Sequence, residues 1–191
     1  MKKFLTYISF SLFTCFLFSC KSELRTDKES ILKKIQSLES NDLKKEYLEN
    51  IFFEYQLILT EEEQVVRQFG YDSPEYEKQQ NQKAKKDDYF LNSTVGYFNT
   101  FGYPERSKLG QYASIAPLIV HYYAAENKGF KKEHFKYFYG AFKFNDIPQE
   151  YFLAYLQSYY EFNEGKTFLK KNKMGVSEEI YAIMDALDID Y

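Results

Sequence analysis

The sequence predicts an all-α fold, a single compact bundle of about seven helices behind an N-terminal lipoprotein leader. Apolar residues recur every three to four positions in one segment after another, which is the spacing of one helix face. Serine, proline and glycine residues stand between these segments, where helices start and stop. No segment shows the sustained alternation of apolar and polar residues that is typical of a strand.

Residues 1–19 have the features of a signal peptide. Lys2 and Lys3 form a positive start, and the apolar segment that follows is too short to span a bilayer comfortably. It closes on Leu17-Phe18-Ser19-Cys20, which resembles the bacterial lipobox, where the cysteine is lipidated and becomes the new N-terminus. The alternatives are an ordinary secretory signal and an uncleaved anchor.

We therefore expect a cleaved leader over 1–19, a lipidated tether over 20–28 and a helical domain over 29–191. The lipid on Cys20 would hold the chain in the outer membrane, on its periplasmic face or at the cell surface. The other cysteine, Cys15, would leave with the leader. The mature domain then has no thiol for a disulfide, so its stability must come from packing.

The first helices are predicted from apolar stripes over Ile31–Leu38 and Leu43–Leu59. Ser40-Asn41-Asp42 separates them and supplies a natural cap. Thr60-Glu61-Glu62-Glu63 has the residues of a capping box, so we expect a further short helix that ends at Gly70.

A long helix is predicted next. Ser73-Pro74 opens it, because proline is favoured at the first helical position, and Gly102-Tyr103-Pro104 ends it. Its early part, Glu75–Asp88, is almost wholly polar, so we expect an exposed arm there. The following helix is expected over about Gln111–Glu126, with Pro117 either in its first turn or at a kink.

The C-terminal part of the chain is rich in aromatic residues at helical spacing. Phe130–Asn145 is predicted as an amphipathic helix, and Asp146-Ile147-Pro148 breaks it and caps the next. That next helix carries a tyrosine-rich stripe and stops at Asn163-Glu164-Gly165. Ser177 is expected to cap a last helix that runs through Leu187.

The composition excludes some classes of protein. Of the 191 residues, 45% are hydrophobic and 20% are aromatic, which is far too apolar for a disordered chain. A carbohydrate-stacking or nucleic-acid platform is one use for 19 Tyr and 19 Phe, but an aromatic core is favoured. The net charge is −3, and removal of two leader lysines leaves 23 basic against 28 acidic residues, or −5. Since the lysines are scattered in pairs, nucleic-acid binding is disfavoured.

The standard motifs of catalysis and metal binding are missing from the sequence. It contains no GxSxG, HExxH, Walker loop or CxxC motif and no Gly-rich phosphate loop, so we expect no metal and no cofactor. The chain has only two histidines. We expect His121, in an apolar run, to be a buried structural residue or else a general base or a ligand. His134 is expected at the surface, on a lysine-rich helix face.

Polar residues supply the remaining candidates. Glu63 and Gln64 stand about one helical turn before Arg67, so these side chains either clamp an anion or a sugar or form a plain cap and ion pair. Asp88 and Asn92 are four residues apart and either line a polar cleft or lie on the surface. Arg106 follows the Gly-Tyr-Pro turn, where it either binds a carboxylate or faces solvent.

The segment Phe101–Tyr123 carries a resemblance to a bacterial family. Its matching positions are Phe101-Gly102-Tyr103-Pro104, Ser107, Leu109-Gly110, Ala113 and the apolar run that follows. This pattern is similar to the centre of domain-of-unknown-function family six-six-two-four, which reads approximately hGWPxRSxVGxxAAxAAWLIVQHAD. The family's Gln-His pair falls on Tyr122-Tyr123, one or two positions after His121, so all three residues are site candidates.

The resemblance extends over about residues 50 to 165. Glu63-Gln64-Val65-Val66-Arg67 is similar to the family's upstream DQxxR, and Asp88 with Asn92 to its acid-and-asparagine pair. Ala154-Tyr155-Leu156 falls where the family has AyL, and the C-terminal stretch looks like a lipoprotein branch. The family has no established activity, so the resemblance implies no reaction.

Three functions remain open at this point. The first is a lipid-anchored, non-catalytic binding domain of the cell envelope, held by the membrane and facing a protein or glycan partner. The second is an envelope hydrolase or glycan-active enzyme that uses the polar candidates in one cleft. The third is an immunity or envelope-stress partner protein. Convergence of the polar candidates in one pocket would favour the enzyme.

Overall fold

The structure, a computed structural model, describes residues 27–124, 132–169 and 174–189. Within these ranges the chain forms helices and no strand, so the predicted all-α fold is confirmed. The eight helices of the described part are α1 (Lys28–Gln36), α2 (Asn41–Phe69), α3 (Pro74–Phe101), α4 (Arg106–Leu109), α5 (Gln111–Tyr123), α6 (Lys132–Lys143), α7 (Gln149–Glu164) and α8 (Val176–Ala186). The predicted leader, Cys20 and most of the tether lie outside these residues.

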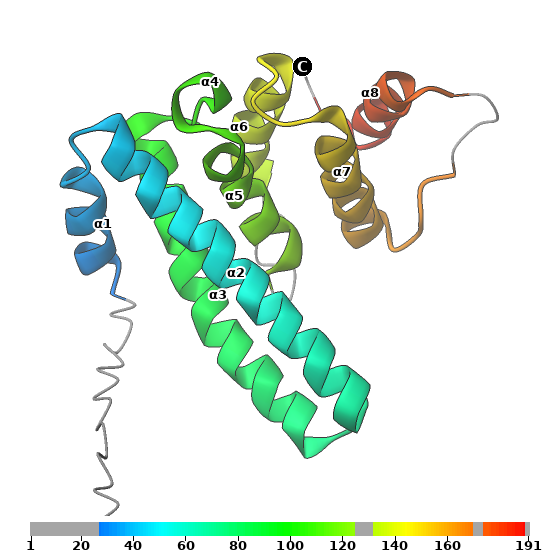
Figure 1. Ribbon diagram of the computed structural model, residues 1–191. Helices are drawn as coiled ribbons and strands as arrows, with labels where there is room; N and C mark the ends of the chain where they lie inside the picture. The colour runs from blue at the N-terminus through cyan, green and yellow to red at the C-terminus, as the bar shows by residue number, and fades with distance from the viewer. Residues whose placement is uncertain (1–26, 125–131, 170–173, 190–191) are drawn as a thin grey trace, which may run out of the picture.

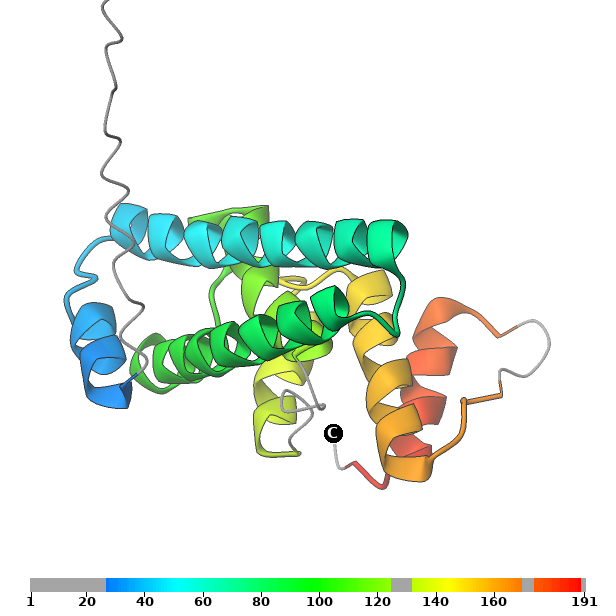
Figure 2. The ribbon, with the colours of Figure 1, turned by 90° about the horizontal axis from the view of Figure 1, so that it is seen from below.

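The long helices α2 and α3 form an antiparallel pair that organises the molecule (Figure 1, Figure 2). Helix α1 packs on α3, and α5 packs on α2 and α3. Helix α7 contacts α5, α6 and α8, so it joins the C-terminal helices to the rest of the bundle. No helix in the described ranges is both long enough and apolar enough to cross a bilayer.

The first three helices begin at side-chain caps. Asp27 accepts a hydrogen bond from the Ser30 backbone N–H at 2.7 Å and caps α1. Ser40 caps α2 and Ser73 caps α3 in the same way, and Pro74 occupies the first turn of α3. These contacts satisfy backbone donors that a helix start leaves open, and they confirm the helix starts predicted at Ser40-Asn41-Asp42 and Ser73-Pro74.

Helix α2 is continuous over 29 residues, so the predicted new helix start at Thr60 is wrong. The Thr60 hydroxyl donates to the carbonyl of Gln56 at 2.9 Å, which is the bond of a threonine inside a helix. No glycine or proline precedes Thr60 to stop the helix, and extending a helix costs less than starting one. The helix ends instead at Gly70, whose φ of 80° suits glycine.

The distal part of the α2–α3 pair forms an exposed two-helix arm, which we define as residues 61–82. Past Ile58, helix α2 buries no further residue, and α3 buries none before Lys83. Within the arm, the Glu62 carboxylate accepts a hydrogen bond from the Gln80 amide at 2.8 Å and contacts the Tyr76 hydroxyl. The predicted exposure of this polar stretch therefore holds up to residue 82.

A short helix, α4, lies between the predicted helix that ends at Gly102-Tyr103-Pro104 and the one predicted from about Gln111, and it leads directly into α5. Gly110 joins them with a φ of 86° and a ψ of 174°, a conformation that is essentially limited to glycine. Pro117 lies well inside α5 and not in its first turn. Most of α5 is buried, as the apolar run predicts.

Aromatic side chains fill the C-terminal half of the core. Phe135 and Phe138 of α6 are buried against Phe152 and Tyr155 of α7, with ring centroids 4.9–6.0 Å apart. This packing confirms the predicted aromatic stripes of both helices.

The last helix starts slightly earlier than predicted. Gly175 is the capping position of α8, and its backbone N–H donates to the Glu178 carboxylate at 2.9 Å. The predicted cap, Ser177, lies inside the helix, and its hydroxyl contacts Gln149 of α7 instead. Glu178, at the third helical position, thus supplies the only half of a capping box that is possible here, because glycine has no side chain to supply the other half.

Candidate functional site

The Gly-Tyr-Pro turn is fixed against α5. The Tyr103 hydroxyl donates to the carbonyl oxygen of Ser114 at 2.6 Å, and the Tyr103 ring stacks on Phe98 at 5.5 Å. Burial, and then the nearby Asp146 carboxylate, raises the pKa of Tyr103 well above its ordinary value. The phenol therefore stays protonated and remains a donor, so the turn and α5 form one rigid unit.

Glu63, Gln64 and Arg67 lie on the exposed arm. Arg67 Nη2 is 2.5 Å from Glu63 Oε1, and the two side chains are 76% and 62% exposed. Gln64 beside them is exposed as well. This arrangement is the self-contained ion pair of a helix surface, with both charged groups already partnered by each other.

Asp88 and Asn92 lie on one face of α3. The Asn92 amide donates to the backbone carbonyl of Asp88 at 2.7 Å, four residues earlier in the same helix. Asp88 is exposed and Asn92 is half-buried. The amide is thus engaged by its own helix, and the structure places the pair on the surface.

Lys83 and Asp87 form a buried charged network that the sequence interpretation missed. Lys83 Nζ lies 3.4 Å from Asp87 Oδ2 and donates to the backbone carbonyl of Tyr123, the last residue of α5, at 2.7 Å. Asp87 Oδ1 accepts the hydroxyl hydrogen of Tyr55 at 2.7 Å. The network therefore joins α2, α3 and α5.

The predicted exposure of Glu75–Asp88 is wrong at these two positions, because Lys83 is 5% and Asp87 0% exposed. They stand four residues apart, so one face of α3 carries both of them toward α2 and α5. The opposite charges compensate each other, which allows both groups to be buried. The spacing of lysine and aspartate was the available signal, but exposed pairs on helices have the same spacing.

Arg106 begins α4 with an exposed side chain. Its backbone N–H donates to Asp146 Oδ1 at 2.7 Å, and this bond ties α4 to the turn that follows α6. The contact that fixes this position is thus made by the backbone and not by the guanidinium.

His121 is completely buried in α5. Its Nε2 lies 3.1 Å from the Thr94 hydroxyl, and its ring meets the ring of His134 edge to face at a centroid distance of 4.9 Å. Phe138 packs on the same imidazole at 5.0 Å. Both histidines of the chain therefore lie together in an aromatic part of the core, between α3, α5 and α6.

The predicted surface position of His134 is wrong, since its side chain is only 7% exposed. His134 shares a face of α6 with Phe138, four residues later, and that face packs on α5. The neighbouring lysines indicated a solvated face, but Lys136, which is exposed, lies two residues after His134 and therefore on a different side of the helix. A step of one or two residues along the helix separates the two environments.

The candidate residues do not meet in one cleft. His121 is buried among aromatic rings, whereas Glu63, Arg67 and Arg106 are exposed on α2 and α4. A buried imidazole cannot act with exposed side chains on a ligand in solvent unless a cleft connects them. The arrangement that would have favoured an enzyme with these groups is therefore not formed.

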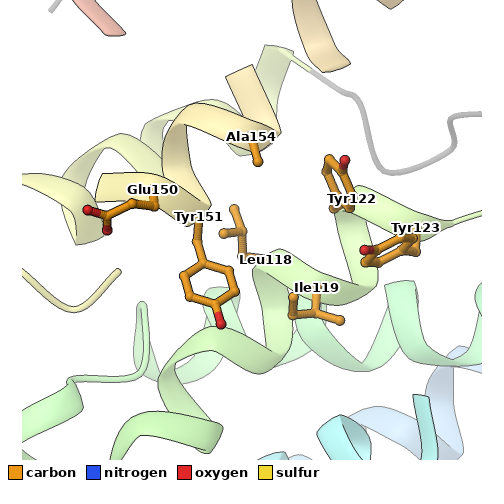
Figure 3. Close-up of a pocket in the computed structure, with 7 residues that line it drawn as sticks. All are labelled: Leu118, Ile119, Tyr122, Tyr123, Glu150, Tyr151 and Ala154. Atoms are coloured by element: carbon orange, nitrogen blue, oxygen red, sulfur yellow. The ribbon is translucent and has the colours of Figure 1, made fainter. Parts of the chain in front are cut away.

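Tyr122 and Tyr123 instead line a pocket of about 270 Å³ between α5 and α7 (Figure 3). The other lining residues are Leu118, Ile119, Glu150, Tyr151 and Ala154. The side chain of Tyr151 points from α7 toward α5, while the Glu150 carboxylate points away from the other labelled side chains (Figure 3). The pocket is thus mainly apolar, with phenol rings at its edges.

The two consecutive tyrosines of α5 form two walls at a right angle. The Tyr122 and Tyr123 ring centroids are 4.5 Å apart and their planes meet at 88°. Burial, followed by the neighbouring Tyr122 and Tyr151, raises the pKa of Tyr123. The Tyr123 phenol is therefore neutral at physiological pH, so this tyrosine offers the pocket an aromatic surface and a hydroxyl group but no phenolate.

The described residues offer no group of three or more His, Cys, Asp or Glu side chains that is placed to hold a metal ion. The fold and the pocket define an all-α domain with an apolar, tyrosine-edged recess between two helices. No protein-family model, curated protein or solved structure matches the chain. The resemblance to domain-of-unknown-function family six-six-two-four therefore stays a prediction from the residues quoted above.

Proposed function

We propose that the protein is a lipid-anchored, non-catalytic binding domain of the cell envelope, and that it holds a partner protein through the pocket between α5 and α7. The observation that carries the proposal is the lining of that pocket by Leu118, Ile119 and three tyrosines. The polar candidates are dispersed, so a binding role accounts for the geometry better than a reaction does.

The size and lining of the pocket suit one side chain of a protein partner. Its volume of about 270 Å³ is below the range of roughly 300–1,000 Å³ that is usual for small-molecule sites. Tyr123 and Tyr151 at its edges are 43% and 41% exposed. Tyrosine is enriched at protein interfaces, where buried anchors that fill such pockets contribute most of the binding energy.

Further exposed apolar side chains lie on α2 and α5. Phe53 is 51% and Tyr112 is 47% exposed, and their rings contact each other at 5.5 Å. Leu57, four residues after Phe53 and therefore on the same face of α2, is 57% exposed. Large apolar groups clustered in this way are typical of interaction surfaces.

The lipid on Cys20 supports the envelope location of this domain. The lipobox-like Leu17-Phe18-Ser19-Cys20 predicts a lipidated N-terminus, and a diacylated cysteine supplies the two chains that stable anchoring requires. A binding domain held at the membrane gains from a high local concentration of envelope partners.

Site-specific photo-cross-linking in intact cells tests the proposal. A photoreactive phenylalanine analogue at Tyr151 should capture a discrete envelope protein from the full-length, anchored chain. The matched control places the same analogue at Tyr71, which is 69% exposed at the tip of the arm. Identical products from both positions, or no product from Tyr151, would overturn the proposed pocket.

A further inference from the structure

A second pocket, of about 570 Å³, lies between the Gly-Tyr-Pro turn and α6. Its volume is within the range of roughly 300–1,000 Å³ that is usual for small-molecule sites. We call it the turn groove. The lining residues used below are Glu105, Ser107, Lys136, Gly140, Phe144 and Asp146. The turn groove shares no lining residue with the tyrosine pocket between α5 and α7.

The walls of the turn groove are held in place before any ligand binds. The Arg106 N–H bond to Asp146 Oδ1, at 2.7 Å, joins the two sides of the groove. On the α6 side, the Tyr137 ring stacks on Phe98 at 4.7 Å, and the Tyr137 hydroxyl donates to Asn99 at 3.3 Å. A binding site with fixed walls loses little entropy when it is occupied.

Gly140 keeps one wall of the turn groove free of a side chain. It lies inside α6, where glycine is weaker than alanine as a helix former. A Cβ atom added at Gly140 would meet nothing within 4 Å, and the residue has no positive φ. Neither close packing nor backbone conformation therefore requires glycine here. A side chain at this position would instead fill open space in the turn groove.

The charged groups of the turn groove are already compensated. Glu105 Oε1 is 2.6 Å from Lys108 Nζ, and Asp146 Oδ1 accepts the backbone bond from Arg106. Lys136 Nζ lies over the Tyr137 ring at 5.0 Å. These contacts leave little net electric field in the groove to select an ionic ligand. The polar groups can still form hydrogen bonds with a ligand. Among the described residues, Asp146 Oδ2 has no partner.

Phe144 supplies an apolar surface beside these polar groups. Its side chain is 82% exposed, an unusual position for a phenylalanine ring. A ligand that matches both features has an apolar face for the ring and several hydroxyl groups for Asp146, Ser107 and Glu105. A pyranose ring has this combination of an apolar C–H face and equatorial hydroxyls.

We propose that the turn groove is a binding site for a neutral saccharide, stacked on Phe144 and hydrogen-bonded to Asp146 and Ser107. The site is independent of the protein-binding pocket between α5 and α7, so each of the two proposals can fail while the other one stands. A glycan of the envelope and a free oligosaccharide present the same chemistry to the groove.

Ligand titrations followed by NMR chemical shifts test the site on the full mature chain. The probes are cellotetraose, chitotetraose and mannotetraose, with tetralysine as a cationic competitor. We expect saturable shifts with at least one neutral tetrasaccharide. Sacculus and outer-membrane extracts, used afterwards as competitors of that probe, distinguish an envelope glycan from a free sugar as the source.

Two variants and one control connect the binding to the turn groove. Phe144→Ala removes the exposed ring and Gly140→Leu fills the open wall, so each should raise the Kd roughly tenfold or more. The Tm of Gly140→Leu should not fall, because leucine favours the helix. Phe69→Ala, which removes an exposed ring at the end of α2, should leave the Kd unchanged.

Three results would overturn the saccharide site. They are the absence of saturable shifts with all three tetrasaccharides at millimolar concentration, an unchanged Kd in both Phe144→Ala and Gly140→Leu, and displacement of the sugar by tetralysine. The last result would assign the turn groove to a cationic ligand. Melting curves measured in parallel show whether a raised Kd in Gly140→Leu comes from a lower Tm and not from the filled wall of the groove.

Discussion

Replacement of Lys83 by methionine tests the energetic role of the buried charged network. Methionine keeps the length and the apolar stem of lysine but removes the ammonium group that contacts Asp87 and the Tyr123 carbonyl. The Asp87 carboxylate then stays in the core with its hydrogen bond from Tyr55. It loses the positive charge 3.4 Å away.

The expected cost is large. Removal of one partner from a buried ion pair destabilises a protein by about 3–5 kcal/mol, because the remaining charge is still desolvated. Lys83 and Asp87 are 5% and 0% exposed, so solvent screening reduces this figure little. A domain of ordinary stability unfolds with about 5–15 kcal/mol, and Lys83→Met therefore removes a substantial fraction of it.

Urea unfolding followed by far-UV circular dichroism measures the effect. The double variant Lys83→Met, Asp87→Leu removes both charges and should be clearly less destabilised than the sum of the two single variants. Glu29 and Lys33 provide a matched control with the same four-residue spacing and a 2.7 Å contact, but their side chains are 77% and 72% exposed. Lys33→Met should cost about 0.5 kcal/mol or less.

The reasoning would be refuted by a Lys83→Met variant that loses less than about 1 kcal/mol, the cost of an ordinary hydrogen bond. Strict additivity in the double variant would refute it as well, because the two charges would then not be coupled in the folded state.

Three further predictions concern pH, helix caps and the anchor. Burial, together with the nearby Glu105 carboxylate, raises the pKa of Tyr97 from 10.0 to about 12. The contribution of the protonated phenol to stability is therefore full below pH 10 and is lost as the pH rises toward 12. Unfolding followed by circular dichroism across this range should show declining stability, and a flat profile would contradict the prediction. Ser40→Ala removes the cap of α2 and should cost about 1 kcal/mol, whereas Thr60→Ala, inside the same helix, should be neutral or stabilising; a Tm loss for Thr60→Ala equal to that for Ser40→Ala would restore the predicted helix start. Cys20→Ala should abolish lipid labelling and release the chain from the membrane fraction, and continued labelling would show that Cys20 is not the lipidated residue.

Local signals were sufficient to predict most helix ends. Ser40 and Ser73 cap helices as expected, because the contact that a cap makes lies within three residues of it. The same local reasoning failed at Thr60, since a capping sequence describes what a helix start needs and not whether the preceding helix has stopped. Gly70 is the residue that does stop α2.

The surroundings of single polar side chains were much harder to predict. His134 and the pair Lys83–Asp87 lie on helices with many lysines, and one residue of rotation separates the solvated face from the buried one. Their burial depends on α5, a helix distant in sequence that provides His121 and the Tyr123 carbonyl. Contacts of this kind are long-range, and the local spacing of the residues does not distinguish them from exposed side chains.

The pockets were beyond prediction for a related reason. Tyr122 and Tyr123 were candidates through a family resemblance, but their partner Tyr151 came only with the packing of α7 on α5. Likewise, Gly140 gave no signal in the sequence, because a glycine near the centre of a helix is tolerated at many sites. Its importance follows from the empty space beside it.

The exposed arm at the end of the α2–α3 pair has a consequence for the dynamics of the chain. Residues 61–82 bury no side chain in either helix, and contacts such as those of Glu62 with Gln80 hold the two helices of the arm together. Helical segments this short are marginal in water without tertiary support. The arm should therefore open as its own sub-global unit, with a free energy far below that of global unfolding. Its amide hydrogens should exchange first, in a gradient that starts at Gly70 and ends at the buried Lys83.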